Sequence, residues 1–543
     1  MSRLPFSAIP HQSRLFVEYQ HDPVSLRKFY QNVVVSPSRI ESYIPTMLER
    51  YVTDRDKLCN ALTEINSKIG AGKTTHDNIR LLRLPETVAV VTGQQAGLFS
   101  GPLYTIYKAL SAVKMAADLN EKGIRAVPVF WVATEDHDFD EVSETFFIGK
   151  GEDLRLTEYR PAGYSESSPV GRVEIDAEIG QVIEQVFADL PETEFSTDIC
   201  ELLTESWMPG SSFGDAFAKT LAAILDKYGI VFIDPMNERI KRLSSPIYAM
   251  AVRNADEIAS RVTSRNAELE KEGFHAQVLV EENYFPLFWH NDAGRRMALR
   301  KVGDGVYRAK EDRREFRLAE LERTASDDPQ RFSPGVMLRP VVQDFLLPTA
   351  CYFGGGAEIA YFAQNSEVYR VLNRPVTPVF HRQSFTVVEA RYRRVLEKLG
   401  LEFSQLFGGL EKTLLTLAEE NFSPDTARLF AKAEETINSE LNALDHTLSQ
   451  IDPTLAENLA KRRRKIIYHI AALRKKTLLA QGRKDDTLNR QVENLFASLL
   501  PNGELQERSI NVVSFLNKFG SGFIEWIYEA IDLEDKDHRI VEL

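Results

Sequence analysis

Unbroken apolar runs alternate with segments of helical length along the first 385 residues. The runs lie at 87–93, 126–134, 228–235, 348–356 and 374–382. Helices are expected between them, for example at 102–120 and 357–372. Apolar strands that alternate with helices are typical of a parallel sheet covered on both faces. The pattern therefore predicts an α/β core at 1–385, whose first 85 residues are helical and amphipathic.

Two stretches of this core have a different pattern of apolar and polar residues. Residues 143–210 and 275–340 carry short β-like runs and polar loops. In the second stretch, AQVLVEENYFPLFWH and RRMALRKVGDGVYRA indicate antiparallel strands. We expect both stretches to be insertions into the sheet domain.

From about residue 386 the pattern changes to long helices. Apolar residues recur at spacings of four and three, which is the a/d seam of a coiled coil. The seam residues are Ile437, Leu441, Leu444, Leu448 and Ile451, then Leu455, Leu459, Ile466, Ile470 and Leu473. Asp452 and Pro453 between the two sets can begin a second helix. The sequence predicts an antiparallel hairpin at 424–482 within a helical domain at 386–509, and a helix in 510–543 that packs back on the core.

Net charge narrows the range of partners. The 543 residues carry a net charge of −13 and the pI is about 5.5. An acidic protein is a poor general partner for nucleic acid, which is bound by clustered Lys and Arg. The run KRRRK at 461–465 is either a solvated helix face or a contact with a phosphate or a partner.

The sequence carries no signal for a membrane or for export. No apolar stretch approaches 18 residues, and MSRLPFSAIPHQSRLF at the start has no apolar signal region. Cys59, Cys200 and Cys351 lie far apart, which fits neither a disulfide framework nor a cysteine-rich zinc site. We expect a cytoplasmic protein without a transmembrane helix.

The sequence GAGKTT at 70–75 imitates a phosphate-binding P-loop. The motif needs a glycine at the position of Ser67 and a strand before the loop, whereas LCNALTEINSKI indicates a helix. We therefore interpret GAGKTT as a linker.

A glycine-rich loop follows the first apolar strand, in VVTGQQAGLFSGPLYTIYKAL at 90–110. Gly93, Gly97 and Gly101 permit close backbone approach, and the helix that follows could offer free amides to an anion. The polar residues beside the loop are Gln94, Gln95, Tyr104 and Lys108. The alternative is a tight turn that only packs the helix on the sheet.

Acidic residues follow the second strand, in TEDHDFDE at 134–141. Glu135, Asp136, His137 and Asp138 come directly after VPVFWVA, and burying several like charges is costly unless a cation shares the site. Three explanations remain open: a metal ion, a substrate ammonium group, or a helix N-terminus rich in acidic residues.

A second strand–glycine–helix sequence occurs in FGGGAEIAYFAQ at 353–364. Gly355 lies in its loop, and Glu358, Tyr361 and Gln364 follow on the helix. The sequence HRQS, with His381 and Arg382, ends the next strand. Three strand ends then carry polar groups on one edge of a sheet, where a pocket is expected.

Four stretches of the chain resemble the cysteine ligases of bacillithiol biosynthesis, the BshC family. They are TGQQAGLFSGPLYTIYKALSA, AVPVFWVATEDHDFDEV, GGGAEIAYFAQ and LQERSIN (505–511), and the resemblance extends over essentially the whole chain. The glycine motif of the family usually contains a proline, whereas this chain has Gly354, Gly355 and Gly356.

The resemblance implies both a fold and a reaction. The fold is a Rossmann-like core with two connecting-peptide insertions, similar in layout to class I aminoacyl-tRNA synthetases, and a coiled coil that helps to form a homodimer. The reaction joins L-cysteine to glucosaminyl malate and gives bacillithiol, after activation of the cysteine carboxylate by ATP. This chain has no HxGH signature, no KMSKS loop and no zinc–thiolate site, so the synthetase-like chemistry is an analogy of fold.

The resemblance also suggests roles for the candidate residues. Glu135, Asp136, His137 and Asp138 are expected to be catalytic, and no residue is assigned as a metal ligand. The expected substrate-binding residues are Gln94, Gln95, Gly97, Tyr104, Lys108, Gly355, Glu358, Tyr361, His381 and Arg382. Arg508 and Asn511 of LQERSIN are expected to contact the adenine nucleotide, ATP or ADP. The alternative is a nucleotide-binding regulatory or scaffold protein of the same fold that forms no amide.

Overall fold

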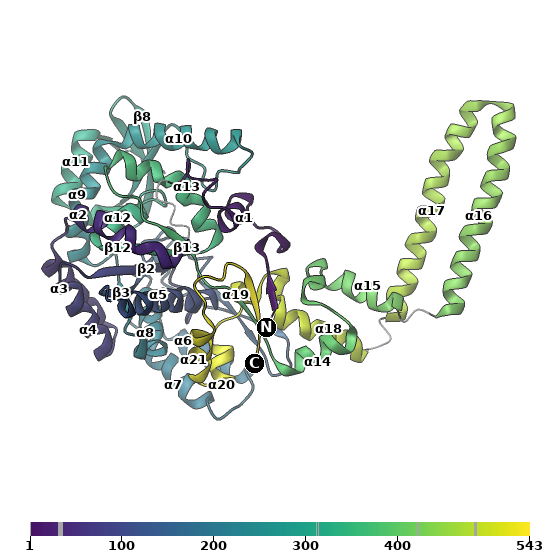
Figure 1. The fold of residues 1–543 in the computed structure, drawn as a ribbon, viewed down its shortest axis with the longest axis horizontal. Helices are drawn as coiled ribbons and strands as arrows, with labels where there is room; N and C mark the ends of the chain where they lie inside the picture. The colour runs from purple at the N-terminus through teal and green to yellow at the C-terminus, as the bar shows by residue number, and fades with distance from the viewer. Residues whose placement is uncertain (1, 31–35, 311, 313, 421–422, 483–485) are drawn as a thin grey trace. The chain divides into compact units, whose positions relative to one another are not determined.

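The chain folds into two compact units. The computed structural model describes residues 2–30, 36–310, 312, 314–420, 423–482 and 486–543. The first unit comprises Met1–Thr386 and Gln506–Val541, and the second comprises Val387–Leu505 and Glu542–Leu543 (Figure 1).

A five-stranded parallel sheet forms the centre of the first unit. Its strand order is β13-β12-β2-β3-β6, and every pairing is parallel. The strands are β2 (Val88–Gln94), β3 (Ala126–Val132), β6 (Val231–Ile233), β12 (Thr349–Gly354) and β13 (Val379–His381). They coincide with the five apolar runs, and their residues are almost all buried, as expected for a sheet covered on both faces. The predicted α/β class is confirmed.

The strand order places a switch point between β2 and β12. The chain adds β3 and β6 on one side of β2, then returns to add β12 and β13 on the other side. Helices α5 (Tyr104–Glu121) and α13 (Gly356–Val371) follow the two strands at this point. Open α/β sheets bind ligands at the carboxyl ends of strands where the order reverses, so this is the expected place for a site.

Further helices of the first unit pack on the central sheet or on neighbouring helices. They are α1 (Arg14–His21), α2 (Ile44–Arg50), α3 (Arg55–Lys68), α4 (Lys73–Leu82), α8 (Phe213–Ile224), α9 (Glu238–Arg253), α10 (Ala255–Lys271), α11 (Leu318–Asp327) and α12 (Arg339–Leu346). Helix α3 precedes GAGKTT, so the P-loop is excluded as predicted; residues 70–72 of the sequence link α3 to α4, and residues 73–75 already begin α4.

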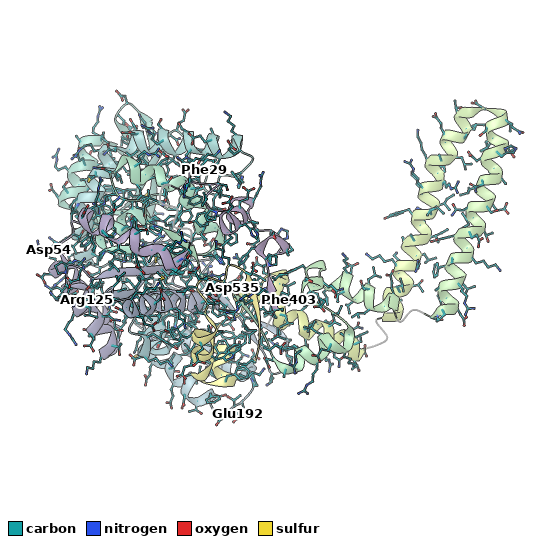
Figure 2. The ribbon with its side chains drawn as sticks, in the orientation of Figure 1. Phe29, Asp54, Arg125, Glu192, Phe403 and Asp535 are labelled. Atoms are coloured by element: carbon teal, nitrogen blue, oxygen red, sulfur yellow. The ribbon has the colours of Figure 1, made fainter. Side chains whose placement is uncertain are left out.

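A buried ion pair ties α10 to α13. Arg265 and Glu367 form this pair, and each side chain is 4% exposed. Nη1 of Arg265 also donates to the carbonyl oxygen of Phe29, at 3.1 Å. Phe29 itself is fully buried among the packed side chains (Figure 2).

The first expected insertion is more helical than its sequence suggested. It begins with an antiparallel hairpin of β4 (Glu144–Ile148) and β5 (Leu154–Glu158), and continues with α6 (Glu178–Asp189) and α7 (Ser196–Ser206).

The second expected insertion contains an antiparallel sheet. Its order is β10-β9-β8-β7-β11, so the antiparallel prediction is confirmed. The strands are β7 (Tyr284–His290), β8 (Arg296–Gly303), β9 (Val306–Ala309), β10 (Glu315–Arg317) and β11 (Phe332–Pro334).

The second unit is helical and contains the predicted hairpin. Its helices are α14 (Ala390–Leu399), α15 (Leu410–Glu420), α16 (Pro424–Ile451), α17 (Pro453–Gly482) and α18 (Asp486–Leu499). Helices α16 and α17 lie side by side and antiparallel (Figure 1), and Oδ1 of Asp452 accepts a hydrogen bond from the Thr454 amide at 2.8 Å in the turn. Arg463, from KRRRK, donates to Asn438 and Asn442 across the hairpin.

The C-terminal segment returns to the first unit from residue 506. It forms α19 (Gln506–Ser509), α20 (Val513–Phe519), α21 (Gly522–Ala530) and β15 (His538–Glu542). Strand β15 pairs antiparallel with β1 (Ser2–Leu4), and a further short strand, β14 (Phe385–Val388), belongs to the same sheet. Helix α21 packs against α5. The segment therefore contributes a strand as well as the expected helix.

Candidate active site

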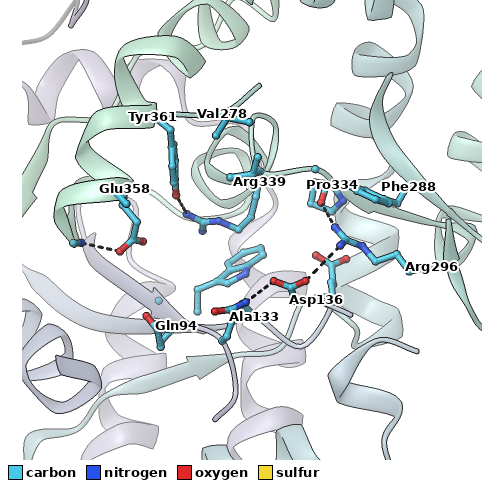
Figure 3. A pocket seen from close by; sticks show the side chains of 18 of the residues that line it. Gln94, Ala133, Asp136, Val278, Phe288, Arg296, Pro334, Arg339, Glu358 and Tyr361 are labelled. Atoms are coloured by element: carbon cyan, nitrogen blue, oxygen red, sulfur yellow. Dashed lines mark hydrogen bonds and ion pairs between the residues drawn. The ribbon is translucent and has the colours of Figure 1, made fainter. Parts of the chain in front are cut away.

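A cavity of about 610 Å³ lies at the switch point of the central sheet (Figure 3). One wall comes from the ends of β2, β3 and β12 and from the first turns of α5 and α13. The opposite wall is more apolar and comes from β7, β8 and the segment 334–339. The cavity therefore joins the Rossmann-like core to the second insertion within one unit.

Lys108 is a fixed part of the cavity wall. It is 3% exposed, and its Nζ donates to the carbonyl oxygen of Gly93 and to Oε1 of Gln94, both at 2.9 Å. It also forms an ion pair with Glu358 of α13. The sequence predicted both residues as pocket residues, and the structure shows that they are partners of each other.

Glu358 closes the glycine loop after β12. It accepts hydrogen bonds from the amide of Gly355 at 2.7 Å and from the hydroxyl of Tyr352 at 2.6 Å (Figure 3 shows the first). Burial alone would raise the pKa of Glu358, but Lys108 and these two donors outweigh it and lower the pKa. Glu358 therefore carries a negative charge at neutral pH.

Arg339 is a pocket residue that the sequence did not reveal. It begins α12, and its guanidinium donates to the hydroxyl of Tyr361 at 3.2 Å and to Oε1 of Gln343 at 3.0 Å. Figure 3 shows Arg339 and Tyr361 pointing toward each other at the pocket wall. The guanidinium carbon lies 5.4 Å from the centre of the Tyr352 ring. Arg339 was missed because it lies inside a segment interpreted as insertion.

Asp136 is held as a carboxylate at the other end of the pocket. Its Oδ1 accepts from the amide of His137 at 2.7 Å, and its Oδ2 accepts from Nε2 of Gln95 at 2.8 Å. Arg296 lies 3.7 Å away (Figure 3). Burial would raise the pKa of Asp136, but His137, Arg296 and Gln95 together hold that pKa well below its usual range. This geometry suits an electrostatic role better than proton transfer.

Arg296 positions the acidic end of the pocket. Its guanidinium lies 3.7 Å from the centre of the Phe288 ring, donates to Ser333 Oγ at 3.0 Å, and lies 3.0 Å from Nδ1 of His137. A guanidinium can only donate, so Nδ1 of His137 is the acceptor and a neutral His137 carries its proton on Nε2.

The cost of burying the acidic cluster is met by cations of the protein itself. Glu135 is 5% exposed and forms an ion pair with Lys241 of α9, which is 2% exposed. The segment after β3 forms turns, so the explanation by a helix N-terminus is wrong. Asp138 is exposed, and neither it nor His137 lines the cavity.

The glycine loop 93–101 is engaged by the chain's own C-terminal segment. The Leu103 amide at the start of α5 donates to the carbonyl oxygen of Ile510 at 2.9 Å. Pro102 and Asn511 form an isolated antiparallel β-bridge. Ser100 Oγ donates to Oδ1 of Asn511 at 2.9 Å. The expectation that this helix N-terminus presents free amides to an anion is therefore wrong. Asn511 is fully buried and does not line the cavity, whereas its neighbour in the motif, Arg508, does.

The glycines of this loop are required for packing. A Cβ on Gly93 would lie 2.8 Å from the carbonyl oxygen of Trp131, and a Cβ on Gly97 would lie 2.9 Å from Cα of Gly101. Positive φ occurs at Phe99 (61°) and Gly101 (64°) and at neither of the other two glycines. Gly93 lines the cavity and Gly97 does not, which favours the packing interpretation for Gly97.

The two residues at the end of β13 have different surroundings. Arg382 lines the cavity. His381 packs instead against the rings of Phe6 and Phe16, with centroids 4.7 and 4.8 Å away, and it does not line the cavity. Burial, with a smaller effect of Arg382, lowers the pKa of His381 well below its usual value. The structure therefore places His381 away from the expected substrate position.

The cavity is positively charged although the protein is acidic. Among the described residues that line it, six cationic side chains accompany three carboxylates. The cationic residues are Lys108, Arg296, Arg300, Arg339, Arg382 and Arg508, and the carboxylates are Glu135, Asp136 and Glu358. A small anionic substrate fits this balance of charge.

Two further features of the described chain concern membranes and metals. No helix in this part of the protein is long and apolar enough to cross a bilayer. Within residues 2–30, 36–310, 312, 314–420, 423–482 and 486–543, no three His, Cys, Asp or Glu side chains are grouped as ligands for a metal ion. The geometry thus gives no support to the metal explanation of the acidic cluster.

Two family models together match almost the whole chain. Residues 3–383 match the family model described as "Bacillithiol biosynthesis BshC, N-terminal Rossmann-like domain". Residues 385–543 match "Bacillithiol biosynthesis BshC, C-terminal coiled-coil domain".

Individual relatives are similar to this chain over nearly their whole length. A protein of Solibacter usitatus is 35% identical over 98% of both chains, and one of Salinibacter ruber is 32% identical over 99% of this chain and 98% of its own. Both carry the name "Putative cysteine ligase BshC". A solved chain from Campylobacter jejuni, titled a "putative arginyl T-RNA synthetase", aligns with 87% of this chain and 97% of its own length. The identity is 9% and the TM-score is 0.23, which is too low to show a common fold. On the match of both domain models, this chain belongs to the BshC family of bacillithiol biosynthesis.

Proposed function

We propose that this protein is a ligase that joins L-cysteine to glucosaminyl malate through an amide bond and so forms bacillithiol. The observation that carries the proposal is the positively charged cavity at the switch point of an acidic protein. Membership of the BshC family, whose relatives bear the name "Putative cysteine ligase BshC", supports the choice of a ligase reaction with cysteine.

Glucosaminyl malate suits the basic side of the cavity. Its malate part carries two carboxylates, and guanidinium groups bind carboxylates through paired hydrogen bonds. Arg382 is buried and Arg339 is partly buried beside this space, each with aromatic contacts that limit its movement. Preorganised cations of this kind lose little entropy when the substrate binds.

Cysteine suits the acidic side. Asp136 stays ionised and, with Gln95, offers oxygen acceptors to a substrate ammonium group. Glu141 accepts from the same Gln95 side chain at 2.7 Å, so the amide of Gln95 is fixed between two carboxylates. We assign the α-ammonium group of cysteine to this end.

ATP enters as a substrate that activates the cysteine carboxylate. Its phosphates require cations, and Arg508 and Arg300 at the cavity wall are the side chains that we assign to them. The amine of the sugar then attacks the activated carbonyl carbon, and the new C–N bond replaces the bond to the leaving group. In this proposal the protein binds and orients three charged substrates and excludes water from the activated acyl group.

We further propose that the hairpin forms a homodimer. The seam is only partly covered within one chain: Leu444, Ile451 and Leu473 are 50%, 70% and 58% exposed. An a/d seam whose apolar residues remain in water is stabilised when a second helix pair covers it.

A product assay tests the proposed reaction. Purified protein is incubated with ATP, cysteine and glucosaminyl malate, and the thiol product is identified by mass spectrometry, with each substrate omitted in turn. Bacillithiol that requires all three substrates supports the ligase. Nucleotide binding without product would favour a regulatory protein of the same fold. If neither product nor nucleotide binding is detected, the result would favour a scaffold protein. The nucleotide product, AMP or ADP, is read from the same reaction by chromatography.

A further inference from the structure

Two adjacent residues of the C-terminal segment, Glu507 and Arg508, differ in their position relative to the cavity. Arg508 lines the cavity, whereas Glu507 is 1% exposed and lies behind its wall. Glu507 accepts hydrogen bonds from Nη2 of Arg382 at 2.7 Å, from Oγ of Ser384 at 2.8 Å and from the amide of Phe385 at 3.0 Å. The groups that donate to Glu507 thus all belong to the segment that directly follows β13.

Arg382 links this buried carboxylate to the cavity. The side chain is 5% exposed, and Nη1 donates to the carbonyl oxygen of Gln383 at 3.0 Å. Its guanidinium carbon lies 5.3 Å from the centre of the Tyr104 ring. The hydroxyl of Tyr104 accepts from Nε2 of Gln94 at 3.2 Å, so the guanidinium supports two further cavity residues.

Breaking the ion pair between Arg382 and Glu507 is costly, and only one of its two members faces the cavity. A buried guanidinium that loses its carboxylate keeps a charge and several N–H donors without partners. Ser384 Oγ also lies 2.7 Å from Nδ1 of His538, which is fully buried. Glu507 is therefore enclosed by Arg382, by the Ser384 hydroxyl and by the imidazole beyond it, and Arg382 is the only one of these that reaches the cavity within the described residues.

We propose that Glu507 is a positioning residue of the substrate cavity, because it holds Arg382 against Tyr104 where this cation faces the anionic substrate. The segment 506–511 is then part of the active site through Glu507 and Arg508, and its docking through Ile510 and Asn511 fixes both. The identity of the substrate rests on the proposed function, whereas the contact between Glu507 and Arg382 does not.

The first test measures affinity for glucosaminyl malate by titration calorimetry. Glu507→Gln keeps the shape and removes the charge, and we expect the dissociation constant to rise at least tenfold, with kcat reduced less than KM is raised. Glu367→Gln is the matched control, because Glu367 holds the buried Arg265 outside the cavity. The control should lower the melting temperature and leave affinity unchanged. Equal affinity in wild type and Glu507→Gln would overturn the proposal.

A double variant separates positioning from general damage. If Glu507 acts through Arg382, then Glu507→Gln combined with Arg382→Gln binds no more weakly than Arg382→Gln alone. Additive losses in the double variant would contradict the proposal.

A second measurement does not depend on the substrate. Phenylglyoxal modifies accessible guanidinium groups, and peptide mapping gives the rate at Arg382. We expect faster modification of Arg382 in Glu507→Gln than in wild type or Glu367→Gln. If wild type fails to bind glucosaminyl malate, the proposed function fails, and this rate alone decides the positioning role. Equal rates in all three proteins would reject it.

Discussion

Lys108 and Glu358 form an ion pair that joins α5 to α13 at the switch point of the central sheet. Their side chains are 4% and 20% exposed, so the pair is largely shielded from water. Because α5 follows β2 and α13 follows β12, the pair holds the first turns of the two helices together in one wall of the cavity. Its charges balance each other, and the excess positive charge of the cavity comes from arginines.

Removal of Lys108 alone should destabilise the first unit. Lys108→Met leaves Glu358 charged and buried, and breaking one partner of a buried pair costs about 3–5 kcal/mol. Thermal melting of the variant should show a clear fall. Adding Glu358→Leu should recover part of the loss, since an apolar pair avoids the buried charge. A double variant that is no more stable than Lys108→Met alone would contradict this account.

Asp136 and Asp138 should differ sharply although they are two residues apart. Asp136→Asn removes the carboxylate beside Arg296 and Gln95, and a hydrogen bond to a charged group contributes about 1.5–3 kcal/mol. We expect kcat/KM to fall about 10- to 100-fold, by the rule that about 1.4 kcal/mol is tenfold. Asp138→Asn is the control and should retain nearly full activity, because Asp138 is exposed and outside the cavity. Equal losses would show that the negative charge of the whole segment matters.

Gly97→Ala should lower stability and activity together. The new Cβ would lie 2.9 Å from Cα of Gly101, and the backbone there is held by Asn511 through Ser100. Overpacking of this kind costs about 1–3 kcal/mol. Gly163→Ala is the control, since a Cβ there meets nothing within 4 Å. The melting temperature and the steady-state activity of both variants are measured. Lost activity of Gly97→Ala at an unchanged melting temperature would show that the loop binds a ligand.

Stability should fall between pH 6.5 and 4 through His538. Burial, only partly offset by Glu507, lowers the pKa of His538 from 6.5 to about 4. The unfolded chain therefore takes up a proton below pH 6.5 while the folded protein does not, so stability is full above that pH and falls toward pH 4. At about 1.36 kcal/mol per pKa unit, this histidine alone accounts for a loss of about 3 kcal/mol. Denaturant unfolding of His538→Gln should show a shallower fall over this range. Identical slopes would mean that His538 titrates normally.

The hairpin should determine the oligomeric state. Deletion of residues 424–482 should give a monomer by light scattering if the exposed seam is the dimer contact. Leu444→Glu should weaken the dimer as well, because it places a charge on the seam. Ser439→Glu, exposed on the same helix and outside the seam, is the control. A deletion variant that stays dimeric would refute the proposal.

The sequence was sufficient to predict the sheet, the hairpin and one edge of the cavity. Buried parallel strands are continuous apolar runs, and their carboxyl ends meet at one edge, so Gln94, Glu135 and Glu358 could be grouped without coordinates. The a/d spacing of the hairpin is likewise a local signal.

The rest of the site depends on contacts between distant segments. Arg296 and Arg339 reach the cavity because the second insertion packs over the sheet edge, and no local pattern predicts that packing. Lys241 neutralises Glu135 from 106 positions away, and Asn511 reaches Ser100 across 411 positions. The glycine loop was therefore interpreted as an anion site, although its partner is the end of its own chain.

The central claim is that the positively charged cavity at the switch point binds glucosaminyl malate. Titration calorimetry of this compound into wild type and into Arg339→Gln tests it most directly, with the exposed Arg261→Gln on α10 as the control. The account predicts binding to wild type, at least tenfold weaker binding to Arg339→Gln, and unchanged binding to the control. Equal affinity for all three proteins, or no binding to wild type, would contradict it.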